Sequence, residues 1–451
     1  MKKISLLLSI AIIFSTCLGT ATAWAVQVQE LPFDVRAKAV YMENLETGQV
    51  MVSQNIDTPL PPASLTKIMT AILTLEKVKN PDTETHTLRP NINEMIVGTG
   101  AKTGGYYPRD EATIRDILYH AMVFSGAEGA LMLADYVSGG SIKLFVQMMN
   151  DRARELGCTN TNFTDPHGLD EEQYTTAHDM AILAKHAMSL PGFAEMVSTY
   201  SYEEHVINKG TSFPITNTNL MLSPRSEYYY APVVGIKTGT ITNDRCLVTQ
   251  AKRNGYTYLV VLLGVPIREA DGTPTTPGNL SFSETKKLYE WAFENFGVRT
   301  AVERGEELVE IPVKYSFDAD FVRLATAEQF TALMHKNIQP SSILYEPDIP
   351  DHLEAPVTKG QTVGKLRLMY MEEELGSVPL VASADIKRSQ LLWAVGWAQN
   401  EIHTFRAKFI ILVTVGLLTL YLVLILRARN IKKRSGKYSS YRSGSEGGYH
   451  L

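Results

Sequence analysis

The stretch ASLTKIMTAILTLEKV, residues 63–78, decides the fold of the first half of this 451-residue chain. Pro61 and Pro62 interrupt the chain just before it, so that Ser64 stands at the start of a helix. Ser64 and Lys67 then lie one turn apart on the same face of that helix. The apolar residues recur at the spacing of a helix that is buried over most of its surface: Leu65, Ile68, Met69, Ile72, Leu73 and Leu75.

Ser64 and Lys67 form an S-x-x-K pattern, in which an amine can activate a hydroxyl. A serine hydroxyl is a weak nucleophile and needs an adjacent base. A lysine is normally protonated near pH 7, but burial disfavours its charge and can make it a base. The apolar Ile68, Met69 and Ile72 favour such burial. The pattern therefore predicts Ser64 as a nucleophile and Lys67 as its base.

Lys237-Thr238-Gly239-Thr240 is a second element that can carry chemistry. Residues 233–240 are predicted to form a strand, on which Lys237 and Thr238 face opposite sides. Gly239 on an edge strand would let a ligand approach the backbone closely. Lys237 could hold an anion, and a backbone N–H near Thr240 could join that of Ser64 in an oxyanion hole.

Both patterns occur a second time in the chain. Residues 283–286 repeat S-x-x-K, but their charged neighbours predict a solvated helix face. Residues 102–104 repeat Lys-Thr-Gly, but they lie in a glycine-rich loop and precede no strand. The earlier S-x-x-K and the later Lys-Thr-Gly are therefore the functional candidates. Ser125-Gly126, between two predicted helices, could place a hydroxyl in the same cleft or form a plain helix-breaking turn.

Ser64-x-x-Lys67, Ser125-x-x and Lys237-Thr-Gly, in that order, resemble the three motifs of penicillin-binding proteins and serine β-lactamases. One group among them, the low-molecular-weight D-alanyl-D-alanine carboxypeptidases, serine peptidases of family S11, resembles the chain in particular. Residues 355–360 resemble the β-rich second domain of that group, and the similarity covers about residues 30–385. The longer matching stretches are residues 63–71, 133–136, 165–169, 176–179 and 235–239.

The resemblance implies a role for each motif. Ser64 would attack the carbonyl between two D-alanines of a peptidoglycan stem peptide, Lys67 would take its proton, and Ser125 would help relay it to the leaving amine. Lys237 would steer the terminal carboxylate, and water would then release the shortened peptide. β-Lactam antibiotics would acylate Ser64 as substrate mimics. No cofactor is implied. The substrate-binding set would be Lys237, Thr238, Gly239 and Thr240.

Position 127 departs from the family pattern. The second motif is normally Ser-x-Asn, but Ala127 and Glu128 follow Gly126. The missing amide should orient the substrate, and losing such a group costs roughly 3 kcal/mol of transition-state stabilisation in the oxyanion-type case. Either a neighbour takes its place or turnover is slow. Two alternatives stay open: a catalytically impaired penicillin-binding or wall-binding protein, and a β-lactamase. The segment around Glu171 and Glu172 lacks the E-x-x-x-N deacylation pattern, which disfavours the β-lactamase.

The composition is that of a globular protein, with 45% hydrophobic and 20% charged residues. The net charge of −5 gives no basic field that would indicate a nucleic-acid partner. The ten histidines are scattered without HExxH or CxxC, so no metal site is expected. Cys17 lies in the N-terminal leader, and Cys158 and Cys246 are predicted to be unpaired packing residues.

Two segments indicate a protein anchored in the cell membrane. Residues 1–25 combine a basic start, a short apolar run and small residues, which is typical of a secretory signal peptide. Residues 409–426 form an uncharged run of 18 residues, the lower edge of spanning length. A basic cluster follows at once and is typical of the cytoplasmic side. The sequence therefore predicts a single-pass protein with its catalytic part outside the cytoplasmic membrane and its C-terminus in the cytoplasm.

The expected fold class is α+β, with a penicillin-binding-protein-like catalytic domain of helices on an antiparallel sheet. Inside it we expect a hairpin over residues 35–54, a second hairpin that turns at Asn254-Gly255, and a helix over 283–296. Short strands are expected at 307–314, 355–366, 368–373 and 377–382. The predicted divisions are a signal peptide at 1–25, the catalytic domain at 26–298, an all-β domain at 299–385, a juxtamembrane segment at 386–408, a transmembrane helix at 409–426 and a basic tail at 427–451.

Overall fold

The structure is a computed structural model that describes residues 31–439, apart from 277, 371, 372 and 404. The predicted signal peptide lies outside the described residues. The chain divides into two compact units. The first contains the chain up to Val302 with Phe330–Glu346 and Arg367–Ser377, and the second contains Glu303–Gln329, Pro347–Leu366 and the chain from Val378. The predicted division of the chain between residues 298 and 299 stays a prediction.

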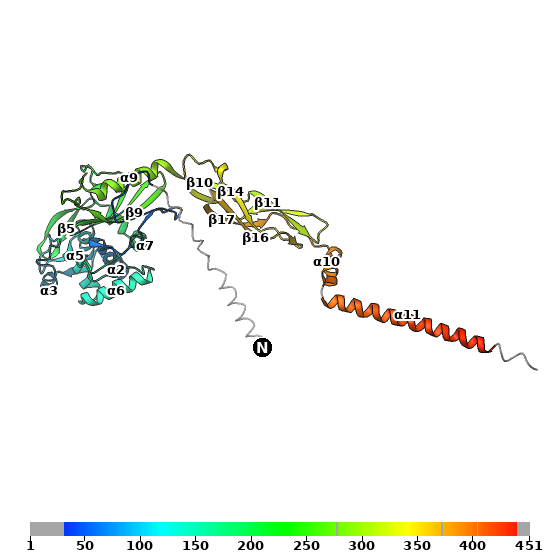
Figure 1. Cartoon of the computed structure of the whole chain (residues 1–451). Coiled ribbons are helices and arrows are strands. Elements are labelled where there is room, and N and C mark those ends of the chain that lie inside the picture. The colour runs from blue at the N-terminus through cyan, green and yellow to red at the C-terminus, as the bar shows by residue number, and fades with distance from the viewer. Residues whose placement is uncertain (1–30, 277, 371–372, 404, 440–451) are drawn as a thin grey trace, which may run out of the picture. The chain divides into compact units, whose positions relative to one another are not determined.

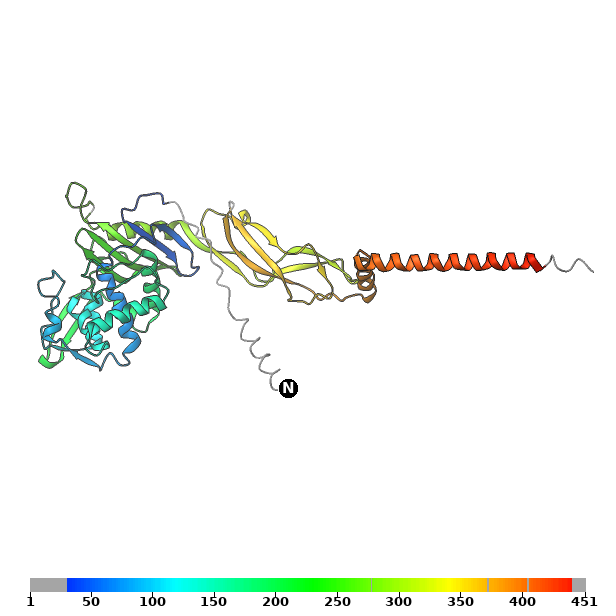
Figure 2. The ribbon, with the colours of Figure 1, turned by 60° about the horizontal axis from the view of Figure 1, so that its bottom comes forward.

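A five-stranded antiparallel sheet in the order β2-β1-β9-β8-β7 forms the centre of the first unit. Figure 2 shows the blue β1 and β2 beside the green strands of the same sheet. Both predicted hairpins are confirmed, and Asn254 and Gly255 have the positive φ angles, 53° and 84°, that a tight turn requires. Because β7 lies at one edge, one side of its backbone is open to a ligand. The strands are β1 (Ala39–Asn44), β2 (Val50–Gln54), β7 (Val233–Ile241), β8 (Asp244–Arg253) and β9 (Tyr256–Pro266).

Each face of this sheet packs against helices. Side chains alternate along β1, so that Tyr41 belongs to one hydrophobic core while Val40 and Met42 belong to another. The predicted helix over 283–296 is α9 (Leu280–Asn295), which packs on β8 and β9 on one face of the sheet. On the other face, α7 (Ala177–Ser189) packs on β1 and β9 (Figure 1). The sheet is therefore buried on both sides.

The larger core belongs to a helical lobe around α2 (Lys67–Lys77). The predicted cap of α4 is confirmed, because the Thr113 hydroxyl accepts a hydrogen bond from the Asp116 amide. Ser141 caps α6 in the same way. The other elements are η1 (Ala63–Thr66), β3 (Thr85–Thr87), α3 (Pro90–Asn93), β4 (Glu111–Thr113), α4 (Ile114–Tyr119), η2 (His120–Phe124), α5 (Ala127–Val137), α6 (Ile142–Glu155), α8 (Phe193–Ser198), β5 (Ser201–Val206), η3 (Ile207–Lys209), β6 (Thr211–Thr216) and η4 (Leu220–Leu222).

The chain after α9 is rich in strands, as expected. Two strands form one sheet, β10 (Phe296–Val302) with β13 (Phe330–His335), and six form another in the order β14-β16-β17-β12-β11-β15. The predicted end of a strand at Leu366 is wrong, because a single strand continues through Arg367. Leu366 and Leu368 are both buried and alternate with polar residues, so the period of two is unbroken there. The six strands are β11 (Glu307–Lys314), β12 (Phe321–Thr326), β14 (Leu344–Asp348), β15 (Leu353–Glu354), β16 (Thr362–Tyr370) and β17 (Glu373–Ala382).

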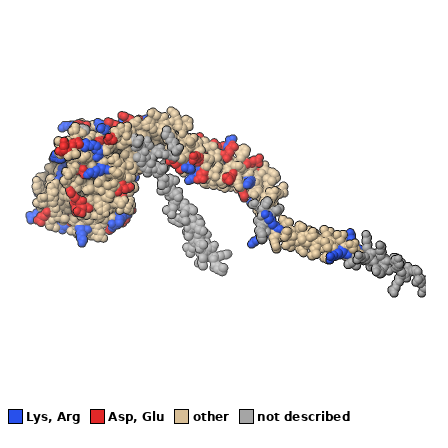
Figure 3. Space-filling view, viewed as in Figure 1, with Lys and Arg blue, Asp and Glu red and all other residues tan. Residues whose placement is uncertain are grey.

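Two helices end the described chain, α10 (Gln390–His403) and α11 (Phe405–Ser439). The segment Lys408–Asn430 of α11 is long and apolar enough to cross a membrane, which suggests membrane anchoring. Figure 3 shows an uncharged middle of this helix with Lys and Arg toward its ends. The helix does not end at residue 426, because the Lys and Arg residues that follow end the apolar stretch but are good helix formers.

Candidate active site

Ser64 and Lys67 meet at the start of α2. Ser64 lies in the η1 turn, and the Lys67 Nζ is 3.0 Å from its Oγ and donates to the carbonyl of His167 at 2.6 Å. The Lys67 side chain is 2% exposed. Burial lowers the pKa of Lys67 to about 8, against the carboxylates of Asp165 and Glu128, which raise it. Near neutral pH a fraction of this amine is therefore neutral, and half of it is neutral at about pH 8, so that it can accept the proton of a neighbouring hydroxyl.

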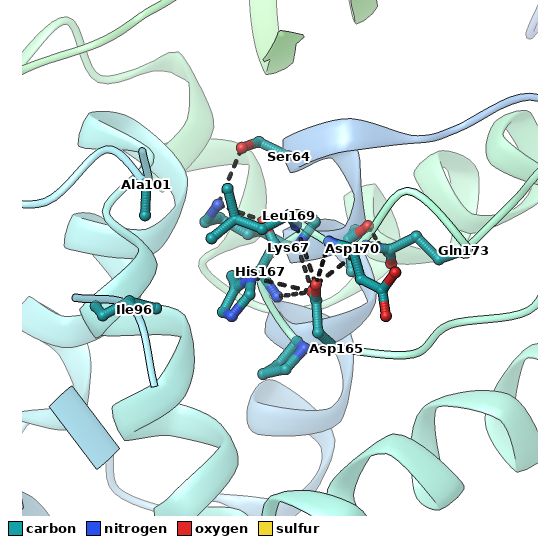
Figure 4. A network of polar contacts seen from close by, with 12 residues as sticks. Ser64, Lys67, Ile96, Ala101, Asp165, His167, Leu169, Asp170 and Gln173 are labelled. Atoms are coloured by element: carbon teal, nitrogen blue, oxygen red, sulfur yellow. Dashed lines mark hydrogen bonds and ion pairs between the residues drawn. The ribbon is translucent and has the colours of Figure 1, made fainter. Parts of the chain in front are cut away.

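The loop that receives Lys67 is organised by Asp165. Its carboxylate accepts backbone N–H groups of four residues, His167, Gly168, Leu169 and Asp170. Figure 4 shows this carboxylate at the centre of the contacts, below Ser64 and Lys67. Burial alone would raise the pKa of Asp165, but the His167 side chain and the backbone donors hold it well below its usual range. The result is a fixed anion that presents the His167 carbonyl to Lys67.

Two further contacts join this loop to α2 and η1. The hydroxyl of Thr66 donates to the amide oxygen of Gln173 at 3.0 Å, and the hydroxyl of Thr70 donates to the carbonyl of Pro166 at 2.6 Å. All of these side chains are buried hydrogen-bonding groups that the sequence left without a role. Residues 165–169 were singled out only by their resemblance to a family, since nothing in their local pattern indicates that they pack under Ser64.

Replacing Gly168 by alanine is expected to disturb the nucleophile directly. Gly168 has φ +92°, and a Cβ there would lie 2.0 Å from the Ala63 carbonyl oxygen and 2.9 Å from the Ser64 nitrogen. We expect a loss of about 2–3 kcal/mol in the free energy of unfolding and slower acylation by a labelled penicillin. Gly157→Ala is the matched control, because Gly157 has φ +91° and open space around it. Equal losses in both variants would contradict the proposed contact.

Lys237 and Ser125 form the other polar pair. Lys237 is 1% exposed, and its Nζ donates to the Ser125 Oγ at 2.8 Å. Burial lowers the pKa of Lys237 well below its usual value, and the charges of Lys67 and Lys102 add to the effect. Ser125 ends a π-helical turn and has φ 70°, a left-handed conformation. Lys237 thus faces Ser125, and Thr238 on the opposite side bonds to Thr218.

A cleft of about 480 Å³ brings these elements together along the edge of β7. A Cβ on Gly239 would lie 3.0 Å from the Cβ of Ala63, so the strand passes close beside the Ser64 turn. The cleft contains Ser64, Ser125, Thr238, Gly239 and Thr240, while Lys67 and Lys237 are buried and do not line it. Two exposed or half-exposed cations that the sequence did not assign, Lys102 and Arg245, also line it.

The second copies of the two patterns behave differently from the first. The Ser283 hydroxyl contacts backbone carbonyls of its own helix and not Lys286. The predicted solvated face is wrong at Glu284, which is buried and accepts a hydrogen bond from the Arg36 amide. Residues 102–104 precede no strand, but Lys102 reaches the cleft and lies 4.2 Å above the Phe124 ring. Cys158 and Cys246 are both free and buried.

Two family models match the chain. Residues 25–266 match that of peptidase S11, D-alanyl-D-alanine carboxypeptidase, and residues 296–388 match the C-terminal domain of penicillin-binding protein 5. Among curated proteins, D-alanyl-D-alanine carboxypeptidase DacF of Bacillus subtilis is 30% identical over 78% of this chain and 86% of its own length. DacC of Escherichia coli is 29% identical over 81% and 88%.

A solved structure gives the same result at the level of the fold. Penicillin-binding protein 5 from Haemophilus influenzae superposes with a TM-score of 0.60 at 27% identity, over 80% of this chain and all of that one. The match extends beyond the helical lobe and the five-stranded sheet into the strand-rich part, because it covers far more than residues 31–266. The two-part α+β architecture is therefore shared with known proteins.

Proposed function

Because the chain belongs to the D-alanyl-D-alanine carboxypeptidases of peptidase family S11, we propose that Ser64 is the nucleophile with which it removes the terminal D-alanine of peptidoglycan stem peptides. The observation that carries this assignment is the buried amine of Lys67, 3.0 Å from the Ser64 hydroxyl. A nucleophile paired with a base at this distance is the arrangement that acyl transfer requires.

The proposed reaction has two stages. As the Ser64 Oγ bonds to the carbonyl carbon, its proton passes to the Lys67 Nζ, and the bond to the leaving D-alanine nitrogen breaks after that nitrogen gains a proton. Ser125 is proposed to relay that proton, because its hydroxyl lies in the cleft with Ser64: it gives its own proton to the leaving nitrogen and recovers the one that Lys67 took, which returns Lys67 to its neutral form. Water then attacks the acyl-enzyme and frees Ser64. Developing negative charge on the carbonyl oxygen would be met by backbone N–H groups of Ser64 and Thr240.

Lys237 is proposed to act from behind the cleft. Its Nζ donates to Ser125 and lies out of solvent, so it orients that hydroxyl. A bound substrate carboxylate would favour the protonated form of Lys237, which would then add positive potential at the carboxylate end of the substrate. The carboxylate itself would meet the hydroxyl groups of Thr238 and Thr240, which line the cleft along the open edge of β7. A β-lactam presents a carboxylate and a reactive carbonyl in a similar arrangement and would acylate Ser64.

We also propose that the catalytic unit lies outside the cytoplasmic membrane. Peptidoglycan is assembled there, and the basic residues Arg427 and Arg429 directly follow the uncharged run 409–426. In this topology the C-terminus is cytoplasmic. The predicted signal peptide at residues 1–25 supports the same orientation.

Release of D-alanine by the purified full-length chain in detergent tests the function. The substrate is a stem pentapeptide that ends in D-alanyl-D-alanine, and the same chain is treated with penicillin in parallel. We expect free D-alanine and a long-lived penicilloyl-enzyme. Ala127 favours one competing activity, a penicillin-binding protein with little turnover, which would form the adduct and release no D-alanine. Rapid hydrolysis of penicillin would instead indicate a β-lactamase.

A further inference from the structure

A buried charged cluster lies directly behind Ser125 and has no part in the reaction described so far. It consists of His120, Glu128 and Glu204, whose side chains are at most 1% exposed. The Nδ1 of His120 lies 2.8 Å and 3.1 Å from the two carboxylate oxygens of Glu204, and its Nε2 forms an ion pair with Glu128 at 3.1 Å. Burying three ionisable groups costs free energy, which their mutual ion pairs and hydrogen bonds have to offset.

The surroundings of His120 favour its doubly protonated form, with Nδ1 hydrogen-bonded to Glu204 and Nε2 close to Glu128 without a hydrogen bond. A neutral imidazole has one N–H, yet each of its nitrogens faces a carboxylate oxygen. Burial alone would lower the pKa of His120, but the contacts with Glu128 and Glu204 outweigh it and raise the pKa to about 9. The other groups around the imidazole are aromatic, and one further carboxylate, Asp116, acts on Glu204 from α4. The ring centroids of Tyr106, Phe124 and Phe213 lie 4.8 Å, 5.1 Å and 6.5 Å from the centroid of the imidazole.

His120 is joined to Ser125 through the backbone and through packing. It begins the π-helical turn that ends at Ser125, and its carbonyl accepts the Gly126 N–H at 3.0 Å. Its ring fills the space against two glycines of the following turn. A Cβ would lie 2.1 Å from Nε2 at Gly126 and 2.8 Å from Cδ2 at Gly129. The position of the Ser125 turn therefore depends on the position of this imidazole.

The cluster also holds a wall of the cleft. The Glu128 carboxylate accepts the Gly104 N–H at 2.6 Å, and the Ala127 N–H donates to the Lys102 carbonyl at 2.9 Å. Gly100 and Lys102 of the same loop line the cleft. An asparagine at position 127 would give this region an amide of its own, but alanine provides none.

We propose that His120, as an imidazolium between Glu128 and Glu204, is a positioning residue that fixes the turn on which Ser125 meets Lys237. The proposal rests on the function proposed above. It explains how the chain keeps the second motif in place with alanine at position 127. As pH rises through about 9, the imidazolium loses its proton and two buried carboxylates remain without a cation. The stability that the cluster contributes is complete below pH 6.5 and is lost across this range, so Ser125 should lose its alignment.

The test is the pH profile of D-alanine release by the full-length chain between pH 6 and 10.5. Wild-type kcat/KM should rise through about pH 8 with Lys67 and fall above about pH 9 with His120. His120→Gln should lower kcat/KM about 10- to 100-fold at pH 8, as expected for a misplaced catalytic group, and should lack the fall above pH 9. The rise near pH 8 should remain. His186→Gln, which removes an imidazole paired with Glu76 on the surface, is the matched control and should keep both limbs.

A second variant covers the case in which His120→Gln does not fold. Glu204→Gln removes one carboxylate, lowers the pKa of the imidazolium, and should move the alkaline fall to lower pH. It avoids Glu128, which also raises the pKa of Lys67. If a folded variant keeps the alkaline fall unchanged, this inference is overturned and the proposed function is not. That holds even when the variant has a lower thermal stability, because His120 would then have a structural role only. No release of D-alanine by the wild type at any pH would overturn the proposed function and this inference with it.

Discussion

Replacing Ser64 by alanine is expected to abolish both acylation by labelled penicillin and release of D-alanine. The Ser64 Oγ is the atom that forms the acyl bond, and it is the hydroxyl oxygen that contacts Lys67. The Ser125 hydroxyl, which belongs to the second motif, is bonded to Lys237 instead. We expect turnover to fall by at least about 10³-fold, because loss of a nucleophile removes the covalent route entirely. Gel fluorography of the penicillin adduct and an enzymatic assay for D-alanine measure the two effects.

The chain supplies its own control for this experiment. Ser283 stands in the second S-x-x-K pattern, and its hydroxyl donates to the backbone carbonyls of Asn279 and Leu280 at the start of α9. Ser283→Ala should therefore label with penicillin as the wild type does. Labelling that persists in Ser64→Ala and disappears in Ser283→Ala would reverse the assignment. The comparison separates the chemistry of the motif from its spacing, which is the same in both copies.

Local patterns predicted most of the first unit because each element there satisfies a local rule. Asn254 and Gly255 tolerate the positive φ angles of a two-residue hairpin turn, which few other residue types do. Thr113 caps α4 by accepting the N–H of Asp116, three positions later. The strand-rich part was predicted less well. β16 crosses a predicted boundary at Leu366 because a charged residue on an exposed strand face looks like a turn when the partner strands are unknown. The exposed or buried state of such a residue is decided by pairing over long distances in the chain.

The candidate site shows the same division. The serine and lysine of one helical turn can be recognised from their spacing, and burial of the lysine follows from its apolar neighbours. The role of Asp165 cannot be recognised from the sequence. Its carboxylate binds the backbone of its own loop, and that loop reaches Lys67 only through the tertiary fold. His120 is another example, since it lies five residues before Ser125 but 84 residues before Glu204. Contacts of this kind leave no periodic trace in the sequence.

Replacing Lys67 separates two possible roles of this amine, and both variants are expected to lose nearly all activity. If Lys67 acts as a base, it must be neutral, and its pKa of about 8 makes acylation rise as pH increases through that value. Arginine keeps a positive charge but cannot lose its proton at these pH values, and methionine keeps most of the volume without an amine. We therefore expect the acylation rate constant of Lys67→Arg and of Lys67→Met to fall about 10²- to 10⁴-fold.

The pH dependence of the remaining activity distinguishes a base from an electrostatic partner. Wild-type acylation by labelled penicillin should increase between pH 7 and pH 9, whereas Lys67→Arg should show no increase, because no group next to Ser64 changes its protonation there. Lys286→Met removes the lysine of the second S-x-x-K pattern and should keep the wild-type profile. Near-normal acylation in Lys67→Arg would mean that the positive charge is what Ser64 needs, and the buried amine would then serve as an electrostatic partner instead of a base. The short contact with the His167 carbonyl holds the amine beside Ser64 whether it carries two protons or three, so both roles are compatible with the geometry and the pH profile discriminates between them.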